Sequence, residues 1–164
     1  MLDMNVVSRV LLIGAGATVA MDLWQLVLGR LGMPTMNLTM VGRWLGHMPR
    51  GRFTHPAIAR AAPIAGERLL GWLAHYAIGM AFAGLLVAVA GAGWMRNPTW
   101  CAALLLGGLS VAAPLLVMQP AMGAGIASSR TPTPLRNVLR SVVNHLVFGA
   151  GLYLSAALLA RVCD

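Results

Sequence analysis

The chain has 164 residues, the length of one domain, and we expect a single domain over residues 1–164. Hydrophobic residues make up 59% of it and charged residues only 10%, a composition typical of integral membrane proteins and unlike that of a disordered or water-soluble chain. The formal net charge of +8 would suit a nucleic-acid partner in a soluble protein. Here the basic residues lie between the apolar runs, where the positive-inside rule expects them, so we expect a lipid bilayer as partner and no nucleic acid.

Apolar runs long enough to cross a bilayer recur along the chain, which predicts an all-α fold, a four-helix transmembrane bundle. The first run ends at Gly32-Met33-Pro34, because glycine and proline interrupt helices. The third run carries Pro114, which predicts a kink since proline removes one backbone hydrogen bond. The helices are predicted at residues 6–31, 69–89, 99–118 and 138–159, and a short interfacial helix is predicted at 38–45 in the first connection, with Trp44 as its anchor.

The distribution of arginine predicts the topology. The first and third connections hold most of the arginines, so both are predicted to be cytoplasmic, with both termini periplasmic in a bacterial inner membrane. The helices would then form two hairpins in parallel register. The repeated pattern H-x-x-x-G, at His75–Gly79 and at His145–Gly149, agrees with such a parallel repeat.

Asp22 is a carboxylate inside the first apolar run, where an ionised group costs roughly 3 kcal/mol on insertion scales unless it has partners. At 1.5 Å rise per residue, Asp22 lies about 12 Å from Arg30, His75 about 10 Å from Arg68 and His145 about 8 Å from Arg140. These three arginines mark the predicted cytoplasmic edge, so we expect one polar layer at a similar depth. Its predicted ligand-binding residues are Asp22, Gln25, His75, Gln119, Asn144 and His145.

Several functions would use this layer. The leading hypothesis is binding or transport of a small anionic solute, and a homodimer is plausible because four helices are few for a transport path. The alternative is a redox protein that holds haem or a transition metal between His75 and His145, with Asp22 as a further candidate ligand. A third reading is a structural or accessory subunit. The sequence contains no motif for a named reaction, so it leaves open whether the protein is an enzyme.

The first connection is long for a structureless loop and carries a cluster of basic side chains. Arginine binds oxyanions through bidentate hydrogen bonds, and histidine adds a group that titrates near neutral pH. We therefore predict an anion or lipid-headgroup contact there. A solvated loop that only sets topology is the simpler alternative. The predicted contact residues are Arg43, His47, Arg50, Arg52 and His55.

Four stretches of the chain resemble a bacterial membrane family catalogued as domain of unknown function 2938. The resemblance covers most of the chain, and its most specific part lies in the first connection. It implies a membrane location and a bacterial source, and it supplies no functional residue. The stretches are Met21–Trp24, Val41–Pro49, Met118–Ala121 and Gly123–Ala127.

Overall fold

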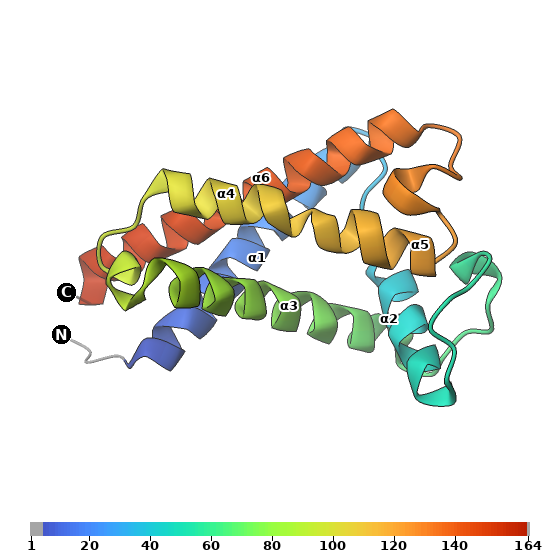
Figure 1. The fold of residues 1–164 in the computed structure, drawn as a ribbon, viewed down its shortest axis with the longest axis horizontal. Helices are drawn as coiled ribbons and strands as arrows, with labels where there is room; N and C mark the ends of the chain where they lie inside the picture. The colour runs from blue at the N-terminus through green and yellow to red at the C-terminus, as the bar shows by residue number, and fades with distance from the viewer. Residues whose placement is uncertain (1–4, 164) are drawn as a thin grey trace. The chain divides into compact units, whose positions relative to one another are not determined.

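The computed structural model describes residues 5–163, and every regular element within that range is helical (Figure 1). The α-helices are α1 (Val6–Arg30), α2 (Leu38–His47), α3 (Glu67–Ala90), α4 (Trp100–Ser110), α5 (Gln119–Ala121) and α6 (Pro134–Cys163). Short 3-10 helices lie at Met48–Arg50, Ile58–Arg60, Ala92–Met95 and Ile126–Ser128, and a π-helix lies at Ala113–Met118.

The predicted all-α fold with four long apolar helices is confirmed. Four helical segments of 22 to 30 residues are long and apolar enough to cross a membrane, the architecture of a membrane protein. Their bounds are Val6–Arg30, Glu67–Ala90, Trp100–Ala121 and Pro134–Cys163. The chain divides into two compact units. Unit 1 comprises residues 5–35, 76–110 and 144–163, and unit 2 comprises residues 36–75 and 111–143.

The helix ends follow local capping rules. The side chain of Asn5 accepts a hydrogen bond from Ser8 N at 2.9 Å and starts α1. Gly32, at φ +73°, ends α1 where the sequence predicted. Helix α6 begins four residues before the predicted residue 138, because Pro134 occupies its first turn, where a missing N–H costs no hydrogen bond.

The predicted disturbance at Pro114 takes the form of a π-helix. Within Ala113–Met118 the hydrogen bonds skip one residue further than in an α-helix, and Gln119 N donates to Pro114 O. The helix then continues to Ala121, three residues beyond the predicted end. The proline therefore changes the hydrogen-bond pattern without ending the helical segment.

Small residues set the helix contacts of unit 1. Lipid is as apolar as a leucine side chain, so helices in a membrane associate by close packing. A Cβ added to Gly14 would lie 2.9 Å from Gly79 O, and one added to Gly149 would lie 2.7 Å from Ala103 O. Both repeated glycines, Gly79 and Gly149, therefore sit at helix contacts. Around them the buried core is Ile13, Ala17, Met21, Ala83, Leu86, Val87, Trp94, Met95, Ala103, Phe148, Leu152 and Ala156.

Within unit 2, α2 is longer than the predicted 38–45 helix and packs on the beginning of α3. Two glycines allow this contact: a Cβ on Gly42 would overlap Glu67 O, and a Cβ on Gly71 would overlap Leu38 O. The backbones at this crossing leave no room for a side chain. The placement of α2 in a membrane interface stays a prediction.

Neighbouring glycines on α4 provide a test of the close packing. A Cβ at position 107 would lie 2.6 Å from His145 O, whereas one at position 108 meets only Leu146 Cδ2, at 3.8 Å. We expect Gly107→Ala to destabilise the protein by about 1–3 kcal/mol through overpacking. Gly108→Ala should be neutral or stabilising by up to about 1 kcal/mol, because alanine favours the helix. Thermal unfolding in detergent measures both, and equal melting temperatures for the two variants would contradict this packing.

Candidate functional site

Asp22, the carboxylate in α1, is half-buried and accepts a hydrogen bond from a tyrosine. The Tyr76 hydroxyl, on α3, donates to Asp22 Oδ2 over 2.9 Å. Sequence reasoning missed Tyr76 and selected the adjacent His75. One signal was present, because a tyrosine hydroxyl inside a protein usually needs a hydrogen-bond partner. Adjacent residues of a helix point about 100° apart, so an error of one position selects a side chain on a different face.

Two further polar pairs join the helices of unit 1. Trp24 Nε1 donates to Asn144 Oδ1 over 3.0 Å, and Asn144 is buried. Ser110 Oγ lies 2.7 Å from Gly107 O and 2.7 Å from His145 Nδ1. A hydroxyl has one proton to donate. When Ser110 donates it to Gly107 O, Ser110 Oγ accepts a hydrogen bond from His145 Nδ1. Ser110 is a second residue that the sequence did not indicate.

The six residues of the predicted layer divide between the two units. In unit 1, Asp22, Asn144 and His145 each take part in a polar pair, and Gln25 is half-buried on α1. His75 and Gln119 belong to unit 2. There the His75 ring meets the Trp72 ring edge-on at 6.1 Å, and Gln119 Oε1 accepts from Ser128 Oγ at 2.9 Å. The six-residue layer stays a prediction.

The predicted redox site is likewise untested. Among residues 5–163, no group of three or more His, Cys, Asp or Glu side chains is gathered where it could hold a metal ion. A haem or metal between His75 and His145 stays a prediction that an absorption spectrum of the purified protein would examine.

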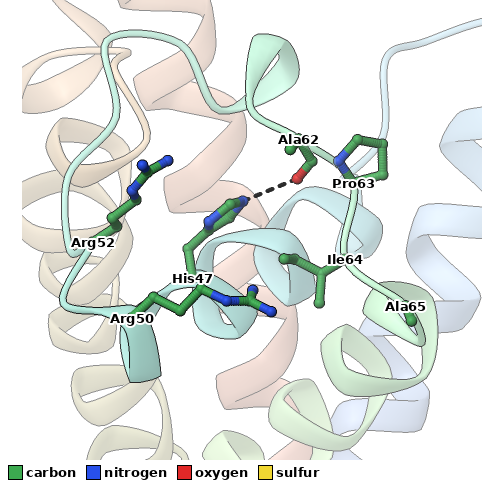
Figure 2. A pocket seen from close by; sticks show the side chains of 7 residues that line it. All are labelled: His47, Arg50, Arg52, Ala62, Pro63, Ile64 and Ala65. Atoms are coloured by element: carbon green, nitrogen blue, oxygen red, sulfur yellow. Dashed lines mark hydrogen bonds between the residues drawn. The ribbon is translucent and has the colours of Figure 1, made fainter.

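Three of the five residues of the predicted anion contact line a pocket in unit 2. It has a volume of about 700 Å³ and is lined by His47, Arg50, Arg52, Ala62, Pro63, Ile64 and Ala65 (Figure 2). Figure 2 shows the His47 ring between the two arginines on one side and the strip of residues 62–65 on the other. Among the described residues 5–163, no acidic side chain lines the pocket.

A tight turn after α2 gathers the basic side chains. Helix α2 ends at His47, and the 3-10 helix Met48–Arg50 is capped by Gly51 at φ +72°, a conformation that favours glycine. Arg52 N then donates to His47 O at 3.3 Å, which closes the turn. The chain reverses within four residues, so Arg50 and Arg52 both lie beside the His47 ring.

His47 is 4% exposed, and its ring is fixed by one hydrogen bond. A carbonyl oxygen only accepts, so the 3.0 Å contact with Ala62 O places a proton on His47 Nε2. In the neutral ring, Nδ1 then carries the lone pair. This nitrogen is buried and has no hydrogen-bond partner among the residues that the structure describes.

His55 is 9% exposed and lies edge-on to His47, with 5.0 Å between the ring centroids. Its backbone N donates to Ala121 O at 2.7 Å, which fixes its position. Neither ring nitrogen has a hydrogen-bond partner within residues 5–163. Burial, and then the nearby His47 and Arg52, hold the pKa of His55 below its ordinary value.

Arg43, the fifth predicted contact residue, is engaged elsewhere in unit 2. Its Nε and Nη2 donate to the Glu67 carboxylate at 2.8 and 2.7 Å, and its Nη1 donates to Ala59 O and Ala61 O at 3.3 and 3.2 Å. Four hydrogen bonds to protein thus occupy the guanidinium. Of the five predicted contact residues, His47, Arg50 and Arg52 line the pocket and His55 adjoins it.

The Arg43–Glu67 pair generates a stability prediction. We expect Arg43→Ala to lower the melting temperature clearly, because it leaves a largely buried carboxylate and two carbonyl oxygens without their donor. Arg60→Ala, an exposed residue of the same connection, is the matched control and should have little effect. Equal melting temperatures for the two variants would show that the pair does not organise unit 2.

His55 generates a pH prediction. Since its pKa is lowered in the folded protein, the unfolded chain takes up the proton first as the pH falls. Its contribution to stability is therefore complete above about pH 6.5, the ordinary pKa of histidine, and is lost as the pH falls through the lowered value. Melting temperatures between pH 8 and pH 5 should fall less for His55→Asn than for the unchanged protein. An unaltered pH dependence in the variant would contradict this assignment.

Comparisons with known proteins place the chain in a family. None of the curated proteins and none of the solved structures matches it. A family model described as "Protein of unknown function (DUF2938)" matches residues 11–159, nearly the whole length and all four long helices. This agrees with the resemblance found in the sequence, and the chain belongs to that family.

Proposed function

We propose that this membrane protein binds a small anionic group in the pocket of unit 2. One observation carries the proposal: His47, Arg50 and Arg52 line the same pocket, and no acidic residue of the described range 5–163 lies in its lining. Arginine presents its N–H groups as a planar fork that matches the oxygens of phosphate, sulfate or carboxylate. The pocket therefore offers two permanent positive charges to the same ligand.

The two arginines are available for a ligand. Both are exposed, and within residues 5–163 no hydrogen bond or ion pair engages their guanidinium groups. Glu67, the acidic residue of unit 2, is paired with Arg43, which offsets its charge. A ligand anion thus would not compete with a carboxylate of the protein for Arg50 and Arg52.

The predicted location of the pocket limits which anions can reach it. The arginines of the first connection favour a cytoplasmic position, with both termini in the periplasm of a bacterial inner membrane. Anions on that side comprise cytoplasmic solutes and the acidic headgroups of the inner leaflet. The proposal extends in three directions. The protein would transport the bound anion, it would act as a homodimer, and the predicted layer around Asp22 would form a second site.

Anion binding by the purified protein tests the proposal. In a zwitterionic detergent, we expect titration calorimetry to detect binding of inorganic phosphate. Arg50→Gln and Arg52→Gln should each weaken it by about tenfold or more, the value of one charge-assisted hydrogen bond. Arg60→Gln, which removes an equal charge from the same connection but outside the pocket, should have little effect. Equal losses in all three variants would indicate general charge attraction, and absence of binding to phosphate, sulfate and acetate would overturn the proposal.

A further inference from the structure

The pocket has two chemically different walls. One wall is basic and consists of His47, Arg50 and Arg52. The other consists of the residues Ala62, Pro63, Ile64 and Ala65, which offer apolar side chains and no charge (Figure 2). A free inorganic anion would use only the basic wall. A pocket of about 700 Å³ with an apolar wall suits an anion that carries an apolar group.

The apolar wall is fixed relative to the basic wall. Ile64 packs over Gly46 of α2, since a Cβ at Gly46 would lie 2.8 Å from Ile64 Cγ2. Ile64 N donates to Glu67 Oε2 at 2.9 Å, and the same carboxylate binds Arg43 of α2. One ion pair thus connects both walls, so the spacing between them is set before a ligand binds. A preformed pocket lowers the entropy cost of binding.

The charges of the pocket favour a dianion. Arg50 and Arg52 supply two positive charges, and the ring of His47 lies beside them (Figure 2). The charged and titratable groups around His47 are Arg50, Arg52, His55 and Glu67, the last held by Arg43. A monoanion would leave positive charge uncompensated. A dianion balances the charges of both arginines.

We infer that the pocket of unit 2 binds a phosphate monoester that carries an apolar group, as its dianion. In this arrangement Arg50 and Arg52 bind phosphate oxygens, and the apolar group lies against residues 62–65. The inference rests on the proposed function and specifies its ligand class. The monoester can come from the bilayer, as a phosphatidic acid headgroup, or from solution, as a phosphorylated amphiphile.

A set of matched ligands tests the inference. Butyl phosphate and butyl sulfate have the same shape, but above pH 7 the phosphate monoester carries nearly two charges and the sulfate one. We expect butyl phosphate to bind about tenfold more tightly than butyl sulfate, because of its extra charge-assisted contact. It should also bind at least about fivefold more tightly than methyl phosphate, because three more methylenes contact the apolar wall.

Two variants of the exposed Ala65 provide a matched pair for the apolar wall. Ala65→Asp places a carboxylate in the wall against which the alkyl chain lies and should abolish the preference for butyl phosphate over methyl phosphate. Ala65→Ser, similar in size and uncharged, should keep it. Melting temperatures of both variants, compared with the unchanged protein, show whether the fold is intact.

The outcomes separate the inference from the proposed function. If phosphate binds through Arg50 and Arg52 but neither the second charge nor the alkyl group increases affinity, the inference is wrong and the proposed function stands. If no anion binds, both are wrong. The source follows from competition: nanodiscs with phosphatidic acid should displace butyl phosphate if the ligand is a lipid, whereas nanodiscs with phosphatidylglycerol, a diester with one charge, should not. If the protein shows the expected ligand preferences and neither kind of nanodisc displaces butyl phosphate, the ligand comes from solution.

Discussion

The ion pair between Arg43 and Glu67 is the interaction on which unit 2 depends. Its carboxylate lies at the first residue of α3, accepts two hydrogen bonds from α2 and also accepts from Ile64 N. Its guanidinium reaches back to Ala59 O and Ala61 O. Burying two charges is expensive, and the cost is offset only when their donors and acceptors are used, as they are here. The pair therefore positions α2, the segment before α3 and both walls of the pocket.

Unit 1 obeys a different constraint, because its helices carry polar groups within long apolar segments. An unpaired polar group is costly where water is absent. The pairs Tyr76–Asp22, Trp24–Asn144 and Ser110–His145 meet this requirement across α1, α3, α4 and α6. Close helix contacts at glycine bring the partners within hydrogen-bonding distance. The same pairs join neighbouring helices, as a structural role for Asp22 requires, and the predicted role of Asp22 in solute binding stays a prediction.

The sequence was sufficient to predict the four long helices and the residues of the basic wall of the pocket. Long apolar runs bounded by glycine, proline and arginine predict four spanning helices without knowledge of their contacts. His47, Arg50 and Arg52 are within six residues of one another, so one turn brings them together. The apolar wall at 62–65 was not predictable, because it depends on an ion pair between residues 24 positions apart. The partners Tyr76 and Ser110 were missed since helix rotation within a bundle is set by packing, which sequence periodicity defines only approximately.

The position of a bound phosphate monoester tests the central claim most directly. A structure of the protein determined with butyl phosphate would locate the phosphorus atom, the strongest scatterer of the ligand. The account predicts phosphorus within reach of Arg50 and Arg52, with its oxygens hydrogen-bonded to their guanidinium groups and the butyl chain along residues 62–65. Phosphorus bound elsewhere, with Arg50 and Arg52 in contact with no ligand, would contradict it.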